Sequence, residues 1–239
     1  MLLGYNLHKS SLRSTDFHNN KIINTLNTHS YCMAKQDKSF RLALINSEIL
    51  LPDGIGIVWA EKFLNKNNLK KIAGHDLFLF LMGQLEKDKG SAFFLGSSNE
   101  TLNKIKAKCK IDFPNVKVET FSPPYEAVFS DEDSKLMCDS VNLSSPDVLF
   151  VGMTAPKQEK WVYKYKNQLE VRNICAIGAV FDFYAGNIKR SSSFWINLGL
   201  EWLPRLVKEP RRLFYRNFVS TPKFILEILS LKIFGKGVL

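Results

Sequence analysis

Residues 148–161 combine residue types that can bind a phosphorylated ligand. Their sequence, VLFVGMTAPKQEKW, runs from four apolar residues through Gly152 and a proline into helix-forming residues. This pattern predicts a buried parallel strand, a tight turn and a helix. Gln158 and Glu159 fall in the first turn of that helix, beside backbone N–H groups that can hold a phosphate, and Lys157 adds a positive charge. Taken by itself, the stretch is explained more simply by an ordinary strand–helix connection.

Asp53 is a candidate general base. It follows a short apolar run and lies between a proline and a glycine, in Leu51-Pro52-Asp53-Gly54. A carboxylate held at such a turn can take the proton of an acceptor hydroxyl. Pro-Asp-Gly is also a common turn sequence, and a plain turn aspartate is the simpler interpretation of this segment alone.

Apolar runs that end in turn residues alternate with helix-forming stretches along most of the chain. Strands are expected at 49–51, 92–95, 116–121, 148–151 and 173–180, and helices at 21–44, 76–85, 100–110 and 130–141. This alternation predicts an α/β fold, a Rossmann-like parallel sheet with helices on both faces. Ligands of such sheets bind beyond the carboxyl ends of the strands, where Asp53, Gly96, Gly152 and Asp182 are expected.

The composition fits a globular protein with a basic surface. Hydrophobic residues make up 45% and charged residues 23%, and 33 Lys and Arg against 23 Asp and Glu give a net charge of +10. The excess predicts an anionic partner: a nucleic acid, a nucleotide or a membrane surface. No run is long enough to span a bilayer, we find no signal peptide, and the four cysteines lack C-x-x-C spacing. We therefore expect a cytoplasmic protein with reduced thiols.

The C-terminal segment carries much of this charge. Residues 203–239 contain eight Lys or Arg and two Glu, a net charge of +6. We divide the chain into an α/β core, residues 1–200, and a short helical appendage, basic and amphipathic, residues 201–239. In its last helix, one face is expected to hold Phe224, Ile228 and Leu231, and the other Lys223, Glu227 and Ser230. Such a segment can lie on an anionic membrane, or it can pack on its own core or on a partner in a homo-oligomer.

The motif G-x-x-x-P-K-Q-E, at residues 152–159, resembles the signature of the WecG/TagA/CpsF glycosyltransferases, bacterial enzymes that build surface polysaccharides. Four other stretches match in the same order: Thr25-Leu26-Asn27, Leu51-Pro52-Asp53-Gly54, Ala73-Gly74-His75-Asp76-Leu77, and Gly199-Leu200-Glu201-Trp202 with Glu209-Pro210-Arg211. The resemblance implies transfer of N-acetylmannosamine or a related hexose from a UDP donor to a sugar on a polyprenyl diphosphate, with inversion. It also implies a metal-independent enzyme on the inner face of the cell membrane.

The resemblance implies roles for individual residues. Asp53 would be the catalytic base, with Thr25 and Asn27 lining the same pocket, although Thr and Asn also cap helices well. Lys71 stands where the family usually has arginine. Either could neutralise a diphosphate, but lysine lacks the bidentate fork, and a solvated surface lysine is the alternative. Substrate contacts are expected from Gly152, Lys157, Gln158, Glu159, Asp182, Gly186, Arg205, Arg211, Arg212 and Arg216. Residues 190–193, R-S-S-S, depart from the family's usual R-A-P.

Two further patterns bear on metals and on other functions. Asp131-Glu132-Asp133 matches the D-x-D pattern by which many glycosyltransferases hold a divalent metal. However, Ser130 and Asp133 have the spacing of a helix capping box, which we favour, and the histidines show no metal-ligand spacing. We therefore expect no metal cofactor. The alternatives to an enzyme are a nucleic-acid-binding protein, which residues 212–216 (RLFYR) fit weakly, and a nucleotide-sugar-binding protein without turnover. The motif match favours the enzyme, so we expect no nucleic acid partner.

Overall fold

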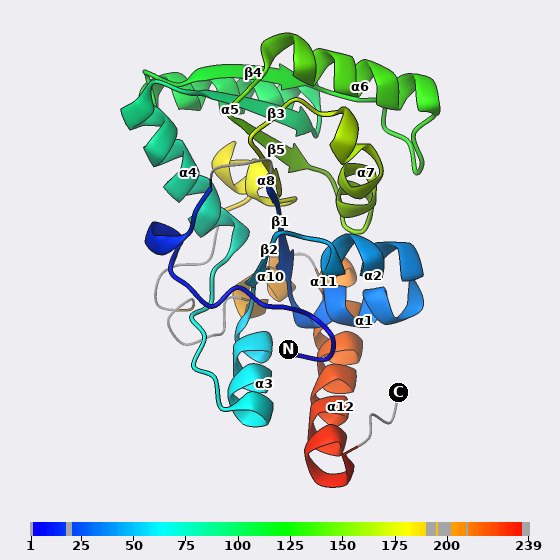
Figure 1. The fold of residues 1–239 in the computed structure, drawn as a ribbon. Helices are drawn as coiled ribbons and strands as arrows, with labels where there is room; N and C mark the ends of the chain where they lie inside the picture. The colour runs from blue at the N-terminus through cyan, green and yellow to red at the C-terminus, as the bar shows by residue number, and fades with distance from the viewer. Residues whose placement is uncertain (1, 18–20, 190–194, 196–201, 209, 236–239) are drawn as a thin grey trace.

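A six-stranded parallel sheet in the order β2-β1-β6-β5-β3-β4 forms the centre of the molecule (Figure 1). The computed structural model describes the whole chain except residues 1, 18–20, 190–194, 196–201, 209 and 236–239. The strands are β1 (Lys21–Leu26), β2 (Ile49–Pro52), β3 (Ser91–Gly96), β4 (Lys117–Phe121), β5 (Val148–Gly152) and β6 (Asn173–Ala176). The predicted class, an α/β fold with a parallel sheet, is confirmed.

Helices connect and cover these strands. The core helices are α1 (Thr28–Gln36), α2 (Lys38–Ile45), α3 (Ile55–Asn65), α4 (Gly74–Asp88), α5 (Asn99–Asp112), α6 (Asp131–Ser144), α7 (Lys157–Tyr165) and α8 (Val180–Tyr184), with short 3-10 turns η1 (Leu12–Ser14) and η2 (Lys166–Gln168). The C-terminal segment contains α10 (Trp202–Lys208), α11 (Pro210–Phe214), the π-helix η3 (Tyr215–Ser220) and α12 (Thr221–Phe234). We call residues 202–234 the C-terminal segment below.

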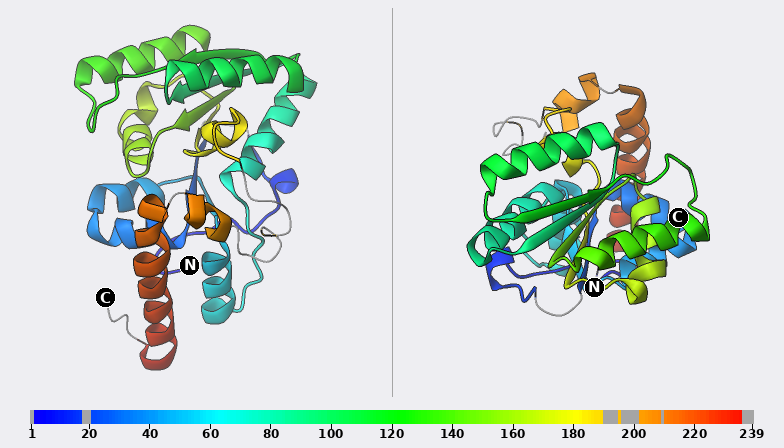
Figure 2. Two further views of the ribbon diagram at one scale, coloured as in Figure 1. Left: turned by 180° about the vertical axis from the view of Figure 1, so that it is seen from behind. Right: turned by 90° about the horizontal axis from the view of Figure 1, so that it is seen from above.

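Both faces of the sheet are buried under helices, as the sequence predicted. Successive side chains of a strand point to opposite faces. Accordingly, Phe94 and Phe150 pack with α4, α5 and α8, whereas their neighbours Phe93 and Leu149 pack with α6 and α7. Figure 2 shows helices on both faces of the sheet. Because both faces are apolar, the strands read as continuous hydrophobic runs, which is why most of them could be found from sequence.

Residues 21–26 form strand β1, and the helix predicted from residue 21 is wrong at this end. The segment lies between β2 and β6 and pairs with both. Ile22 and Ile23 are buried on opposite faces, and the buried amide of Asn24 donates to the hydroxyl of Ser47 at 2.8 Å. The neighbouring strands satisfy the backbone of this segment on both sides, and that long-range pairing overrides a local pattern with polar residues at its centre.

Strand β6 is shorter than predicted. The N–H groups of Ile177 and Gly178 both donate to the carbonyl of Val151, at 3.0 and 3.3 Å, so the ladder ends there. Gly178 has φ of +50°, which glycine adopts without strain, and α8 follows directly. Asp182 therefore lies inside α8, not at the end of a strand.

Helix α12 packs on its own chain with one face. Phe224 and Ile228 are fully buried in a cluster with residues of α1, α2 and α3. Glu227 and Ser230, predicted on the polar outer face, are buried too, so that assignment is wrong. Figure 1 shows α12 beside α1 and α3, at the opposite end of the molecule from α6. The helix is apolar on much of its circumference, so its inner face could not be chosen from hydrophobic spacing alone.

Candidate active site

Asn27 and Asp53 directly follow two neighbouring strands, β1 and β2. The strands pair in register from Ile23 with Ile49 to Leu26 with Pro52, and the N–H of Asp53 extends the pairing to the carbonyl of Leu26 at 2.9 Å. Thr25 pairs with Leu51, one residue before the end of β1, and is partly buried. The three residues are thus brought to one point at the carboxyl edge of the sheet, the edge at which parallel sheets bind ligands.

Asn27 also caps helix α1. Its side-chain Oδ1 accepts hydrogen bonds from the N–H groups of His29 and Ser30, both at 3.0 Å, and the Ser30 hydroxyl accepts from the Asn27 N–H. The capping interpretation is therefore confirmed for Asn27, whereas Thr25 is a strand residue. Because the cap uses Oδ1, the amide NH2 is the group that Asn27 can offer to a ligand.

The chain returns to the same edge after α3. The N–H of Ile72 donates to the carbonyl of Pro52 at 3.0 Å, which places Lys71 next to the end of β2 and its Asp53. The following motif, residues 73–77, begins α4. Gly74 packs there against the turn between β6 and α8, where an added Cβ would lie 3.4 Å from Val180. Residues 71–77 therefore connect the Asp53 side of the edge to the end of β6.

Gln158 and Glu159, at the start of α7, are buried rather than presented at the surface, with exposed fractions of 4% each. The Gln158 Oε1 accepts from the N–H of Met153 at 3.2 Å, and its Nε2 donates to Glu159 Oε1 at 2.8 Å. Gly178 lies against the Gln158 amide, since a Cβ there would be 3.5 Å from both amide atoms. These contacts fix the orientation of the Gln158 amide between the ends of β5 and β6.

Lys157 points away from Gln158. Its ammonium lies 3.5 Å from the centre of the Phe129 ring and donates to the carbonyl of Glu126. Burial lowers the pKa of Lys157. The side chain therefore holds the segment between β4 and α6 against the start of α7, and this arrangement brings Lys157 together with residues that the sequence did not single out.

The carboxyl group of Glu159 is buried and only partly hydrogen-bonded. One of its two carboxylate oxygens has no hydrogen-bond partner, and burial raises the pKa of Glu159 to about 7. Its pKa in the unfolded chain lies near 4.5, so the carboxyl is neutral in both states below that pH. As the pH rises from about 4.5 to 7, the unfolded chain ionises first, and the folded protein loses stability. Above pH 7 the loss is complete.

We therefore expect Glu159→Gln to gain stability relative to the wild type as the pH rises. Between pH 5 and pH 8, the difference in free energy of unfolding should shift toward the variant by about 3 kcal/mol, at 1.36 kcal/mol per pKa unit. Urea unfolding at both pH values measures it. The exposed Glu170→Gln is the matched control and should show no such shift. An unchanged difference for Glu159→Gln would contradict a buried, protonated carboxyl.

Asp182 and Gly186 lie farther along the carboxyl edge of the sheet, near the start of α5. Asn187 connects Asp182 to α5: its amide donates to Thr101 at 2.9 Å and to Asp182 at 3.4 Å, and its Oδ1 accepts from Lys104 at 2.9 Å. Asp182 is partly buried and Gly186 is exposed. This group stands beyond β3 and β6, whereas Asp53 stands beyond β2, so the candidate residues form two groups along one edge.

Arg216, in η3, lies on the Asp53 side of the edge, because the Thr221 hydroxyl donates to its carbonyl and is 3.0 Å from the hydroxyl of Thr28, the residue after Asn27. Burial and the charge of Arg216 both lower the pKa of His29, which is two residues from Asn27. The side chains of Arg205, Arg211 and Arg212 lie outside the described part of the structure, although their backbones belong to α10 and α11. The residues 190–193, 199–201 and 209, named from the motifs, also lie outside it.

The D-x-D pattern forms a helix cap, as the sequence favoured. The Ser130 hydroxyl accepts from the N–H of Asp133 at 3.0 Å, and Asp131 accepts from Lys164 and Tyr165, both at 3.0 Å. Within the described part of the chain, no three His, Cys, Asp or Glu side chains gather where they could hold a metal ion. Metal independence itself stays a prediction.

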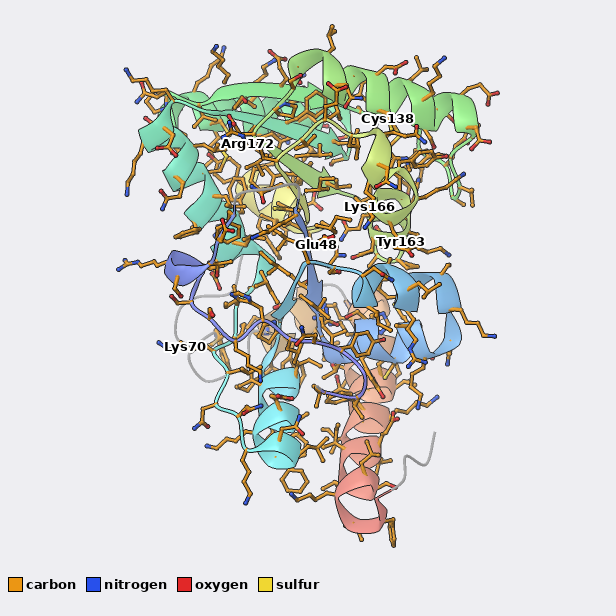
Figure 3. The ribbon with its side chains drawn as sticks, in the orientation of Figure 1. Glu48, Lys70, Cys138, Tyr163, Lys166 and Arg172 are labelled. Carbon is orange, nitrogen blue, oxygen red and sulfur yellow. The ribbon has the colours of Figure 1, made fainter. Side chains whose placement is uncertain are left out.

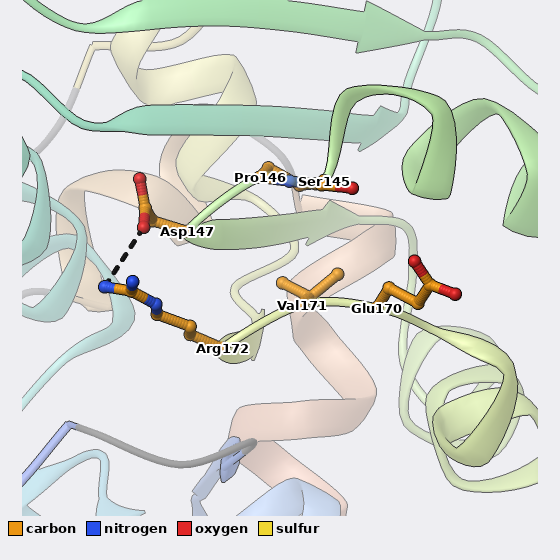
Figure 4. A pocket seen from close by; sticks show the side chains of 6 residues that line it. All are labelled: Ser145, Pro146, Asp147, Glu170, Val171 and Arg172. Atoms are coloured by element: carbon orange, nitrogen blue, oxygen red, sulfur yellow. Dashed lines mark ion pairs between the residues drawn. The ribbon is translucent and has the colours of Figure 1, made fainter.

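The opposite, amino-terminal edge of the sheet contains an open pocket of about 420 Å³. Its lining residues are Ser145, Pro146, Asp147, Glu170, Val171 and Arg172 (Figure 4). Asp147 faces Arg172 across it at 3.3 Å and accepts from the N–H and hydroxyl of Ser91. Nearby, Lys166 approaches Glu48 at 3.8 Å (Figure 3), and Glu48 accepts from the N–H of Ile22. These contacts join strand starts and lie away from the motif residues.

The fold is that of a parallel α/β protein, and the polar residues that gather at the carboxyl edge of its sheet form a candidate ligand site. The family model described as "Glycosyl transferase WecG/TagA/CpsF family" matches residues 6–237. The chain therefore belongs to the WecG/TagA/CpsF family of glycosyl transferases, and the resemblance inferred from the motifs is confirmed.

Two curated relatives carry the same name, N-acetylglucosaminyldiphosphoundecaprenol N-acetyl-beta-D-mannosaminyltransferase. The protein from Bacillus spizizenii is 32% identical over 223 residues, which cover 92% of this chain and 84% of the relative. The protein from Bacillus subtilis is 31% identical over 209 residues, covering 87% and 79%. The similarity to these relatives thus covers most of this chain. The family match includes the C-terminal segment.

Proposed function

We propose that this protein transfers N-acetylmannosamine or a related hexose from a UDP donor to a sugar on a polyprenyl diphosphate, with inversion, in the synthesis of a bacterial surface polysaccharide. The names of the two Bacillus relatives support the lipid-linked acceptor and the sugar. The observation that carries the mechanism is the meeting of Asn27 and Asp53 at the ends of β1 and β2, beside Lys71.

In this mechanism Asp53 is the general base. Its carboxylate takes the proton of the acceptor hydroxyl while the oxygen attacks the anomeric carbon of the donor and the bond to UDP breaks. A single displacement of this kind inverts the anomeric centre. The departing diphosphate gains negative charge, which the cationic side chains of Lys71 and Arg216 can stabilise. Thr25 and the amide NH2 of Asn27 orient the reacting groups.

The second group of residues would hold the donor. The carboxylate of Asp182 is an acceptor for ribose hydroxyls, and Gly186 leaves the surface beside it free of a side chain. Gln158 is held in one orientation by Met153 and Glu159, so the turn at the end of β5 is rigid before the donor arrives. Gly152 allows the sheet edge and α8 to approach each other closely there.

The C-terminal segment supplies a surface for the membrane that holds the acceptor. The outer face of α12 exposes Leu226 by 64%, Ile233 by 69% and Phe234 by 72%, and η3 adds Phe218 at 52%. Within the described residues, no helix combines the length and apolarity needed to cross a bilayer. We infer that this apolar surface, with the basic residues around it, binds the inner face of the cell membrane peripherally.

Replacing Ile233 and Phe234 together by serine should lower binding to vesicles that contain anionic lipid by about tenfold or more, because two exposed apolar side chains lose their burial in the interface. Co-sedimentation with such vesicles measures the change. Leu143→Ser is the matched control, since Leu143 is 91% exposed on α6, at the other end of the molecule. Equal loss in both variants, or none in either, would contradict docking through α12.

The proposed reaction is tested by measuring UDP release from a panel of UDP-sugars, with and without a synthetic polyprenyl-diphosphate-linked N-acetylglucosamine. Release that requires the acceptor identifies a transferase, and the sugar that supports it identifies the donor. We expect the rate to survive EDTA, because no metal cofactor is expected. If no UDP-sugar turns over with the acceptor, the proposal is wrong. Loss of the rate in EDTA would overturn metal independence only.

A further inference from the structure

A seam of polar contacts joins the C-terminal segment to helix α1. On α1 the contributing residues are Thr28, His29, Tyr31, Cys32 and Lys35, and on the C-terminal segment they are Ser220, Thr221 and Glu227. These partners are separated by nearly the whole length of the chain, so the seam is a product of tertiary structure. We call it the α1 seam.

Glu227 forms the lower part of the α1 seam. The residue is 5% exposed, and its carboxylate accepts from the ammonium of Lys35 at 2.7 Å and from the hydroxyl of Tyr31 at 3.0 Å. The Tyr31 ring meets Phe224 edge-on, with ring centres 5.2 Å apart. A buried carboxylate is costly unless it is paired, so α12 is held at the one position along α1 at which Glu227 meets both donors.

The upper part of the seam ties Arg216 to α1. The hydroxyls of Thr28 and Thr221 are 3.0 Å apart, and the Thr221 hydroxyl donates to the carbonyl of Arg216 at 3.1 Å. His29 adds a hydrogen bond of 2.8 Å between its Nδ1 and the Ser220 hydroxyl. Arg216 lies in the π-helix η3, a rare conformation that is frequent at functional sites.

This position places Arg216 at the Asp53 side of the sheet edge. Asn27 caps the first turn of α1, and the residue before it, Leu26, accepts the backbone hydrogen bond of Asp53. Thr221, which donates to the Arg216 carbonyl, also contacts Thr28, the residue after Asn27, so the backbone of Arg216 lies beside the turn that carries the candidate catalytic residues. An arginine is suited to bind a phosphate through two parallel hydrogen bonds, and fixing its backbone beforehand lowers the entropy cost of binding.

We propose that Glu227, together with Tyr31 and Lys35, is a positioning residue: it holds the C-terminal segment in the register at which Arg216 meets a diphosphate of the substrates. The inference rests on the proposed function. It gives the buried Glu227 a role in substrate binding, beyond its part in packing α12 on α1. The diphosphate belongs either to the UDP donor or to the lipid-linked acceptor.

The test uses isosteric changes that keep the packing. The seam variant combines Tyr31→Phe with Glu227→Gln, which removes the hydroxyl donor and the charge but leaves the shapes. We expect kcat/KM to fall about tenfold, the scale of one charge-assisted hydrogen bond. A rise in the KM for the UDP-sugar assigns the diphosphate to the donor, and a rise in the KM for the lipid assigns it to the acceptor. Glu61→Gln, a change at another buried carboxyl, should leave these constants unchanged.

A double-mutant cycle separates positioning from general stability. Arg216→Gln should lower kcat/KM at least as much as the seam variant. If Glu227 acts through Arg216, adding the seam changes to Arg216→Gln causes no further loss. Multiplying losses would show that the seam and Arg216 act independently, and would overturn the proposal. So would a seam variant with wild-type kinetics.

An NMR titration of His29 tests the placement without any turnover. Burial and the charge of Arg216 lower the pKa of His29 in the docked state. The seam variant and Arg216→Gln should each raise it. If His29 titrates identically in the wild type and the seam variant, the proposal fails even where the enzyme is active. If the pKa of His29 rises but the wild type transfers no sugar, the placement holds, and the proposed function and with it the role at a diphosphate fail.

Discussion

Asp53→Asn is expected to lower kcat for sugar transfer by roughly 10²- to 10⁴-fold, the usual contribution of a positioned general base. The amide has nearly the same shape as the carboxylate but cannot take the proton of the acceptor hydroxyl. The backbone contact that places residue 53, from its N–H to the carbonyl of Leu26, does not depend on the side chain. The fold and the affinity for the UDP donor should therefore stay close to wild type.

UDP release with the lipid-linked acceptor measures this loss, and isothermal titration with UDP measures donor binding. Asp139→Asn is the matched control, an exposed aspartate on α6. It should keep wild-type values in both assays. Full activity of Asp53→Asn would assign the base to another residue. A loss of UDP binding in parallel with kcat would make Asp53 a binding residue instead.

Gly152→Ala is expected to lower the free energy of unfolding by about 3 kcal/mol, the upper range for overpacking a well-packed core. A Cβ at this position would lie 2.4 to 2.5 Å from three atoms of the Phe181 ring. Phe181 is 2% exposed and packs against Phe94, with ring centres 5.4 Å apart, so it has little room to yield. The displacement would move α8 and Asp182, and donor affinity should fall as well.

Gly83→Ala, in helix α4, is expected to change the free energy of unfolding in the opposite direction. Apart from the nearby backbone of the helix itself, no atom of the described residues lies within 4 Å of an added Cβ there, so the substitution should stabilise the protein by about 0.5–1 kcal/mol through helix propensity. Urea unfolding of both variants and the wild type measures the two effects. Similar stability of Gly152→Ala and the wild type would show that α8 can move away from β5 without cost.

The candidate site was predictable where a motif coincides with a strand end. Asp53 and Gly152 follow apolar runs, and both lie at the carboxyl edge of the sheet. The neighbours of Asp53 were harder to predict from the sequence. Thr25 and Asn27 belong to the end of β1, which the local pattern assigned to a helix, so the motif match placed them and the secondary-structure prediction did not. Strand β1 is recognisable only from its two partners.

The burial of Gln158 and Glu159 could not be predicted from the sequence either. Their positions in the first turn of α7 were correctly predicted, but a helix start is open to solvent or covered according to what packs on it. Here Gly178, from the turn after β6, lies against the Gln158 amide. Burial at this helix start excludes water from Glu159 and raises its pKa to about 7.

The sequence by itself determined the parallel α/β class, the family, and the cap at Ser130, because each depends on residues close together in the chain or on an ordered set of motifs. Only the tertiary structure decided which face of α12 is buried, and that Glu227, Lys35 and Tyr31 meet across the α1 seam. The physical reason is that α12 is apolar on much of its surface, so hydrophobicity permits several orientations. The pairing of one buried carboxylate selects among them.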